Sequence, residues 1–126
     1  MLVVDSSVLV GALLRPGRSR ERLSGEELHA PHLLDSQVTS ALRGLVLGDR
    51  LAAEHAERAL DGLQSARIRR YSASPMTRRV WQLRAKLSAY DALYVALAER
   101  LGADLVTADA RIARAPGLRC SVEVVA

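Results

Sequence analysis

The sequence of 126 residues contains little cysteine and has no long apolar run. Cys120 is its only cysteine, so the chain cannot form an internal disulfide and needs no oxidising compartment. No stretch approaches the ~18 consecutive apolar residues of a membrane-spanning helix, which argues against a membrane protein. The opening residues, Met1–Asp5, lack the basic region and the long apolar run of a signal peptide. We therefore expect a cytoplasmic protein with no membrane partner.

Aromatic residues are also scarce, at 3% of the chain, and phenylalanine is absent. This scarcity argues against a surface on which single-stranded bases stack on aromatic rings. Arginine is abundant instead: Lys86 is the only lysine among 18 basic residues, and the formal net charge is +4. Guanidinium groups suit phosphate and carboxylate partners. The charge is compatible with binding to nucleic acid or to an acidic partner, and equally with a solvated, arginine-rich surface.

Length and hydrophobicity indicate one globular domain. With 49% hydrophobic residues the chain is too apolar for an intrinsically disordered polymer. Domains most often contain ~100–150 residues, and the sequence shows no repeat, low-complexity tract or linker. We predict a single domain that spans residues 1–126.

Short apolar runs alternate with segments of helical periodicity along the whole chain. The predicted strands are Leu2–Val4, Leu28–Ala30, Ile68–Tyr71, Asp104–Thr107 and Ser121–Val125. The predicted helices are Val8–Leu14, Arg18–Leu23, Leu33–Leu47, Leu51–Leu63, Ser74–Leu87 and Ser88–Leu101, with a further helical turn after Asp109. This alternation predicts an α/β fold with a mostly parallel central sheet of about five short strands and helices on both faces.

Three aspartates stand where such a fold places ligands. Asp5 and Asp109 follow predicted strands, and Asp91 lies in the first turn of a predicted helix. Ligands of open parallel sheets bind outside the carboxyl ends of the strands. Each aspartate also has a purely structural interpretation: Asp5 as a helix cap, Asp91 as part of a capping box with Ser88, and Asp109 as a turn residue.

Taken together, the three aspartates favour a metal site. Three carboxylates at one sheet edge repel each other unless a cation neutralises them, and oxygen ligands suit Mg²⁺ or Mn²⁺. Such an ion can lower the pKa of a bound water and stabilise a departing phosphate oxygen. An acidic metal pocket on a basic chain is typical of a nuclease.

Four segments carry a resemblance to a known family. Leu2–Val8 resembles the opening of PIN domains, and Ala30–Leu34 with Val38–Arg43 resembles their second conserved helix. Tyr90–Ala98 and Leu105–Asp109 resemble the third and fourth conserved segments. In length and order the whole chain is similar to VapC-type toxins of bacterial toxin–antitoxin pairs.

This resemblance implies a PIN-like fold and an endoribonuclease that depends on Mg²⁺ or Mn²⁺. The ion would activate a water that hydrolyses RNA phosphodiester bonds. The resemblance also implies a homodimer and a cognate VapB-type antitoxin whose C-terminal segment covers the active site. Which RNA is cleaved is not implied.

The family's acidic quartet corresponds to Asp5, Gln37, Asp91 and Asp109, and its supporting hydroxyls to Ser6 and Thr107. The three aspartates would bind the metal. Gln37 stands where the family usually has a glutamate; its amide lacks the negative charge and cannot act as a general base.

Three explanations of Gln37 stay open at this point. The protein tolerates glutamine with weaker metal binding, or it is an inactivated variant, natural or engineered, or the register is shifted and Asp35 is the ligand. Asp35 is a poor substitute on a helix, because residues two apart do not share a face. The first hypothesis is therefore an active toxin ribonuclease. The alternative is a catalytically weak or inactive PIN-fold protein that binds RNA or an antitoxin.

Overall fold

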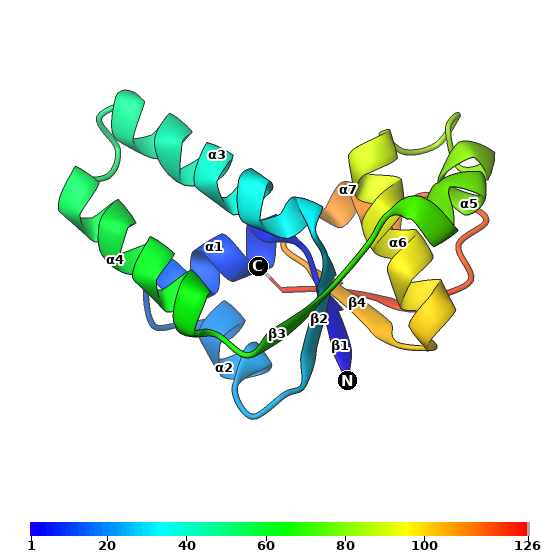
Figure 1. Cartoon of the computed structure of the whole chain (residues 1–126), viewed down its shortest axis with the longest axis horizontal. Coiled ribbons are helices and arrows are strands. Elements are labelled where there is room, and N and C mark those ends of the chain that lie inside the picture. Colours follow the sequence, from blue (N-terminus) through cyan, green and yellow to red (C-terminus); the bar gives the residue numbers. More distant parts are fainter. Residues whose placement is uncertain (126) are drawn as a thin grey trace.

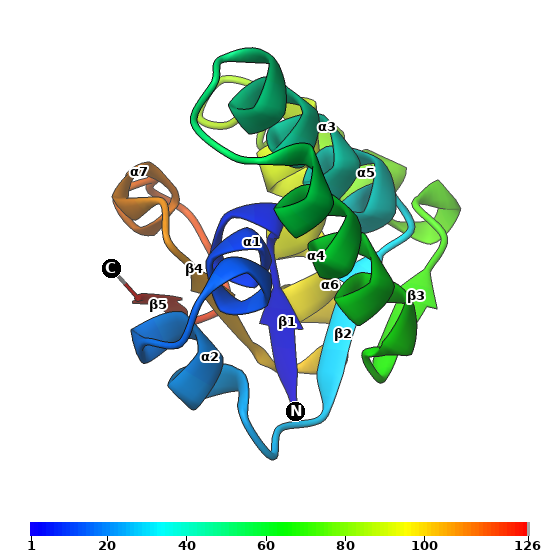
Figure 2. The same ribbon diagram turned by 90° about the vertical axis from the view of Figure 1, so that its left-hand side faces the viewer.

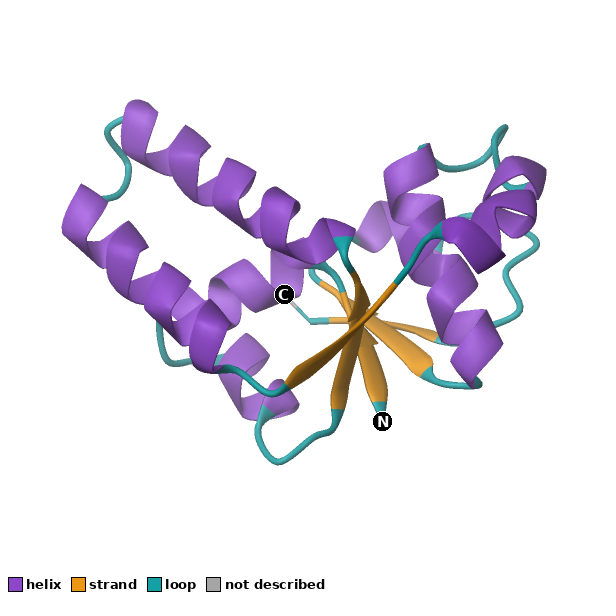
Figure 3. Ribbon diagram, viewed as in Figure 1, coloured by secondary structure: helices purple, strands orange, loops and turns teal. Residues whose placement is uncertain are grey.

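The computed structural model describes residues 1–125 and contains one five-stranded sheet in the order β3-β2-β1-β4-β5. Its strands are β1 (Leu2–Val4), β2 (Leu28–Pro31), β3 (Ile68–Tyr71), β4 (Asp104–Thr107) and β5 (Val122–Val124). All four pairings are parallel, and the strands fan out with the twist seen in Figure 3. The predicted parallel α/β fold is confirmed. The predicted domain also includes Ala126, which lies outside the described residues.

Helices cover the sheet on both sides, as the alternating pattern predicts. They are α1 (Ser6–Leu14), α2 (Arg18–Leu23), α3 (Leu33–Leu47), α4 (Ala53–Ser65), α5 (Thr77–Gln82), α6 (Ala89–Leu101) and α7 (Ala110–Ala113), with a 3₁₀ turn, η1 (Ser74–Met76), before α5. Figure 1 shows α1 to α4 on one side of the sheet and α5 and α6 on the other, and Figure 2 shows α1 and α2 beside β1. No helix within residues 1–125 is long and apolar enough to cross a membrane.

Helix α6 forms the largest part of the core on its side of the sheet. Its residues Ala92–Ala98 are all buried, and the helix packs against β1, β2 and β4. A helix that is apolar on nearly all sides is stable only in such a position. Ser88 caps its start by accepting a hydrogen bond from the Asp91 N–H, and Gly102 ends it at a φ of 65°, a left-handed conformation that glycine adopts without strain. The two ends fix where Asp91 lies along the helix.

The strand order defines where the chain's functional groups meet. β1 is central, and Val4 pairs with Val106 of β4. The carboxyl ends of β1 and β4 therefore lie side by side, and they place Asp5, which follows β1, next to Thr107, the last residue of β4. The connections run to β2 on one side of β1 and to β4 on the other, so this edge is the topological switch point at which α/β sheets bind ligands.

The predicted helix Ser74–Leu87 is wrong in its bounds. The segment begins with the 3₁₀ turn, and α5 ends at Gln82. The amide groups of Leu83, Arg84 and Lys86 then bond to carbonyls three residues earlier, and such bonds tighten a helix end into turns. Residues 83–87 thus lead into α6 as turns, and α4 likewise starts at Ala53, two residues later than predicted.

Candidate active site

Asp5 is buried at the carboxyl end of β1, with 5% of its surface exposed. Its Oδ1 accepts hydrogen bonds from the Ser7 Oγ at 2.7 Å and from the Val8 N–H at 3.2 Å, which caps α1. Its Oδ2 accepts a hydrogen bond from the Thr107 hydroxyl of β4. The carboxylate is therefore both a helix cap and a link between β1 and β4, and three donors hold it in one orientation.

Asp5 nevertheless retains an unfavourable charge. Burial raises the pKa of its carboxyl above the ordinary value, and the negative charge of Asp91 adds to this. The hydrogen bonds from Thr107, Ser7 and Val8 oppose the rise in pKa without cancelling it. A proton or a cation next to Asp5 would therefore be favourable.

Asp91 lies in the first turn of α6, is half-buried, and its negative charge acts on Asp5. Besides Asp5, its charge also raises the pKa of Tyr94 and of Arg111. Within residues 1–125 its carboxylate accepts no side-chain hydrogen bond, and only its backbone N–H takes part in the cap with Ser88. Of the predicted capping box, the hydrogen bond from the Asp91 N–H to the Ser88 hydroxyl is present, and the return bond to the Asp91 carboxylate is not found in the described residues. The Asp91 carboxylate thus remains available to a ligand.

Asp109 begins α7 and lies close to Thr107, whose Oγ1 accepts a hydrogen bond from the Asp109 N–H at 2.9 Å. Its carboxylate accepts from the Arg111 N–H at 2.9 Å and pairs with the Arg111 guanidinium, with an Nη2–Oδ2 distance of 2.7 Å. Arg111 lowers the pKa of this carboxyl below its ordinary value. Because the Arg111 side chain is 79% exposed, the guanidinium can move away without leaving a buried charge.

Gln37 lies on α3 and accepts a hydrogen bond on Oε1 from the Tyr94 hydroxyl at 2.7 Å. Tyr94 is 1% exposed and lies one helical turn after Asp91, on the same face of α6. Burial, together with the charges of Asp5 and Asp91, raises the pKa of Tyr94 far above its ordinary value, so that its hydroxyl stays protonated and donates. This hydrogen bond uses one lone pair of Oε1, and the Nε2 group of Gln37 has no hydrogen-bond partner within residues 1–125, so it can donate to a ligand.

Asp35, the alternative to Gln37, is engaged elsewhere. Its two carboxylate oxygens accept from the Nε and Nη2 groups of Arg70, each at 2.8 Å, and this pair lowers the pKa of Asp35. A bidentate pair of this kind holds a carboxylate in a fixed direction. Asp35 is therefore already engaged by Arg70, and the correspondence of Gln37 to the family's glutamate stays a prediction.

Sequence reasoning missed three side chains around these residues: Ser7, Tyr94 and Arg111. The hydroxyl of Ser7 donates to Asp5 and accepts a hydrogen bond from the Ala108 N–H at 2.9 Å. Ser6 makes no side-chain hydrogen bond within residues 1–125, and its supporting role stays a prediction. The only signal for Ser7 was its place two residues after a helix-capping aspartate.

The donor set fits a hard divalent cation in its chemistry, because Asp5, Asp91 and Asp109 offer carboxylate oxygens. Burial raises the pKa of Asp5, so a positive charge beside this carboxylate would be favourable. In the part of the chain that the structure describes, no three Asp, Glu, His or Cys groups converge closely enough to hold one ion. Asp109 is paired with the guanidinium of Arg111.

Comparison with known proteins gives full-length matches. A family model for the PIN domain matches residues 2–118. Ribonuclease VapC9 of Mycobacterium tuberculosis (strain ATCC 25618 / H37Rv) is 46% identical over 125 residues, which are 99% of this chain and 98% of that protein. Ribonuclease VapC1 of the same strain is 46% identical over 128 residues, covering 98% of this chain and 96% of that protein.

Solved structures share the fold. PAE2754 from Pyrobaculum aerophilum superposes with a TM-score of 0.75 at 23% identity and covers 98% of this chain and 83% of that chain. VapC20 of Mycobacterium tuberculosis, a sarcin–ricin loop cleaving toxin, gives a TM-score of 0.65 at 14% identity and covers 89% of this chain and 92% of that chain. At these identities the likeness concerns the fold alone.

Proposed function

The chain belongs to the PIN-domain family, and we propose that it is a VapC-type toxin that hydrolyses RNA phosphodiester bonds. Nucleases of this kind generally depend on a divalent metal ion. The observation that carries the proposal is the buried Asp5 carboxylate at the switch point, with its raised pKa and with the charge of Asp91 beside it. The full-length identity of 46% to ribonucleases VapC9 and VapC1 supports the same activity.

We assign the metal site to Asp5, Asp91 and Asp109, and the ion to Mg²⁺ or Mn²⁺. When bound, the ion would supply an activated water and offset charge that builds on the phosphate. Ser7 and Thr107 hold Asp5 in place before any ligand arrives, so little reorganisation is needed there.

Arg111 has two roles in this proposal. Without a cation it neutralises Asp109 through the pair at 2.7 Å. When Asp109 turns toward a cation, the exposed guanidinium of Arg111 becomes available at the edge of the site. A guanidinium in that position pairs well with a phosphate oxygen of the RNA.

Gln37 orients a ligand and does not take a proton. Tyr94 occupies its Oε1, so the Nε2 group can donate a hydrogen bond to a water or to a phosphate oxygen. This keeps a polar contact where the family has a glutamate, although one negative charge is lost. The alternative of an inactive binding protein rests only on that lost charge and is less well supported than an active ribonuclease.

A partner surface adjoins the proposed site. A groove of about 390 Å³ between α1 and α2 reaches Ser7 and Ala108 at one end, and Arg15 and Arg18 also line it. We propose that a segment of a cognate VapB-type antitoxin lies in this groove and covers Asp5. An arginine of that segment would pair with Asp5, Asp91 and Asp109, which we call the acidic cluster.

A homodimer is the second proposed assembly. An apolar groove of about 500 Å³ is lined by Leu33, Val80 and Leu93 beside Tyr90, and Tyr90 is 61% exposed. A second copy that covers this face would bury it. We expect a dimer in sedimentation at micromolar concentration and a monomer after Tyr90→Asp; a wild-type monomer would contradict the proposed dimer.

Localisation in the cytoplasm is likewise a proposal, supported by an RNA substrate and by a chain with one half-buried cysteine, Cys120.

The function is tested by incubating the purified chain with a mixed cellular RNA pool in Mn²⁺. We expect discrete cleavage that EDTA stops and added Mn²⁺ restores. Cleavage that continues unchanged in EDTA would overturn the metal-dependent mechanism.

A further inference from the structure

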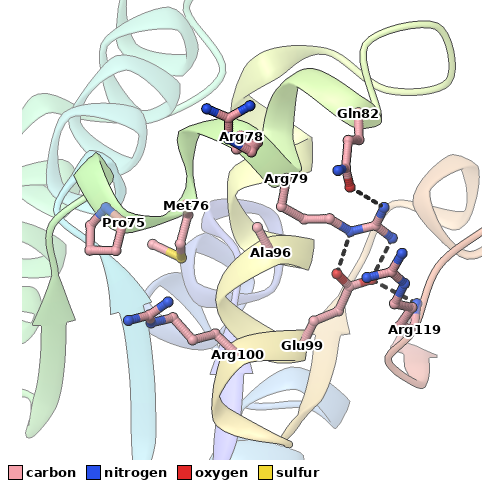
Figure 4. Close-up of a pocket in the computed structure, with 9 residues that line it drawn as sticks. All are labelled: Pro75, Met76, Arg78, Arg79, Gln82, Ala96, Glu99, Arg100 and Arg119. Carbon is pink, nitrogen blue, oxygen red and sulfur yellow. Dashed lines mark hydrogen bonds and ion pairs between the residues drawn. The ribbon is translucent and has the colours of Figure 1, made fainter.

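A second polar pocket, of about 450 Å³, lies between η1, α5 and the later part of α6. None of the acidic cluster lines it. Met76 and Ala96, each 3% exposed, form an apolar floor, and arginines surround it (Figure 4). Glu99, on its rim, follows Asp91 by eight positions on α6, which corresponds to about 12 Å along the helix axis at 1.5 Å per residue. We call this the α5–α6 pocket.

One arginine of the α5–α6 pocket is structural. The Arg79 guanidinium donates to both carboxylate oxygens of Glu99, with distances of 2.7 and 3.0 Å, and the two side chains are only 18% and 10% exposed. The same pair holds the loop after α7, because Arg79 also donates to the Gly117 carbonyl and Glu99 accepts from the Arg119 N–H. This pair forms one wall of the pocket and leaves no net charge.

The other arginines leave positive charge uncompensated. Arg78 and Arg100 line the pocket from α5 and α6, are exposed, and form no ion pair in the described part of the chain. Figure 4 shows their guanidinium groups apart from each other, Arg78 above Met76 and Arg100 below it, and both away from the Arg79–Glu99 pair. The side chain of Arg119 adds a third positive charge at the Glu99 side. With only one carboxylate on the rim, the pocket attracts an anion.

The chemistry around the floor suits a nucleotide. Guanidinium groups pair with phosphate and also stack on bases. The apolar floor formed by Met76 and Ala96 can lie against one face of a base. The side chain of Gln82 accepts a hydrogen bond from Arg79 on Oε1 at 3.3 Å, which leaves its Nε2 group to donate to a base edge. At about 12 Å along the α6 axis from Asp91, the pocket is within reach of a short RNA segment whose scissile phosphate lies at Asp91.

We propose that the α5–α6 pocket binds one nucleotide of the substrate RNA outside the scissile bond, and so contributes to affinity and substrate choice. This inference rests on the proposed ribonuclease function. Arg78 and Arg100 each contact one of the two phosphates that flank this nucleotide, and Gln82 contacts the base. An acidic peptide would meet the same charges, and binding of such a peptide in place of RNA would overturn the proposal.

The test compares two double variants in an Asp91→Asn background, in which binding is measured without cleavage. Arg78→Ala with Arg100→Ala removes two pocket charges. Arg58→Ala with Arg67→Ala removes two exposed charges elsewhere and serves as the matched control. Fluorescence anisotropy with a labelled single-stranded RNA is recorded over a range of salt concentrations.

We expect the pocket variant to bind at least about tenfold more weakly, the loss typical of one base and its phosphate. The slope of log K against the logarithm of the salt concentration should become less negative by about 1.4, since each of the two phosphate contacts to a single strand contributes ~0.7. The control should stay within about twofold of the parent, because scattered surface charges are screened. Equal behaviour of the two double variants would overturn the proposal.

Kinetics separate the pocket from the function itself. In the cleaving protein, the pocket variant should raise KM for a long RNA and leave kcat unchanged, and Gln82→Ala should raise KM by a different factor for different flanking bases. If the unmodified chain cleaves RNA but the pocket variant keeps its KM, the pocket proposal fails and the function stands. If the unmodified chain neither binds nor cleaves RNA, the proposed function fails as well.

Discussion

Replacing Asp5 with asparagine should stabilise the folded chain while it abolishes cleavage. The carboxylate is 5% exposed, and burial, aided by the charge of Asp91, raises its pKa. Asparagine has nearly the same shape. Its Oδ1 can accept from Ser7 and from the Val8 N–H, and its Nδ2 can donate to the Thr107 hydroxyl, which also accepts. The variant therefore loses the buried charge and keeps the hydrogen bonds.

The magnitude follows from two opposing effects. Removing a disfavoured buried charge stabilises the fold, whereas hydrogen bonds to a neutral amide are weaker than those to a carboxylate. The net gain expected when a functional-site constraint is relieved is about 0.5–2 kcal/mol. For a chain of this size such a gain raises Tm by roughly 2–8 °C.

The pH dependence gives the prediction its sign. The pKa of Asp5 in the folded protein lies above its ordinary value of 3.8. Below pH 3.8 the carboxyl is therefore protonated in both the folded and the unfolded chain, and its ionisation does not lower the stability of the wild type relative to Asp5→Asn. As the pH rises from 3.8 to the folded pKa, the unfolded chain ionises first and the wild type loses stability. The stability gap between Asp5→Asn and wild type should therefore open over this range and stay constant above it.

Urea unfolding at a series of pH values measures this gap, and Asp35→Asn is the matched control. Arg70 lowers the pKa of Asp35, so that substitution should destabilise the chain above pH 3.8 and lose its effect as the pH falls through the folded pKa. An Asp5→Asn variant that is less stable than wild type at neutral pH, or a gap that does not change with pH, would refute the reasoning.

Three further predictions concern single contacts. Tyr94→Phe removes the hydrogen bond to Gln37. It should lower kcat by about fivefold, which corresponds to one hydrogen bond of ~1 kcal/mol, with little change in KM. An unchanged kcat in steady-state assays would contradict this prediction. Arg111→Ala frees the Asp109 carboxylate and should tighten Mn²⁺ binding at neutral pH by about three- to tenfold in an EPR titration, whereas weaker binding would contradict it. Glu99→Gln leaves a largely buried guanidinium without its counter-charge and should cost about 2–4 kcal/mol in urea unfolding, and a neutral effect would show that the pair is not structural.

The fold was largely predictable because its signals are local. The predicted bounds of β1, β3 and α3 agree with the structure, since short apolar runs and helical spacing are set by neighbouring residues. The segment 74–87 was predicted as one helix because its spacing does not distinguish α-helix from 3₁₀ turns. The strand order, in contrast, comes from long-range pairing, which periodicity does not encode.

The candidate site was predictable in position and not in detail. Asp5 and Asp109 follow strands, and the parallel sheet brings both to one edge. The donor to Gln37 is Tyr94, 57 positions later in the chain, and no local pattern connects the two. Ser6 and Ser7 differ by one helix position, which turns a side chain by about 100° and decides which hydroxyl meets Asp5.

The central claim is that the acidic cluster at the end of β1 cleaves RNA. The most direct measurement is single-turnover cleavage of a cellular RNA by the wild type, Asp91→Asn and Gln37→Glu in Mn²⁺, with circular dichroism to verify that all three are folded. We expect cleavage by the wild type, equal or faster cleavage by Gln37→Glu, and none by Asp91→Asn. Metal-dependent cleavage at the wild-type rate by a folded Asp91→Asn variant would contradict it.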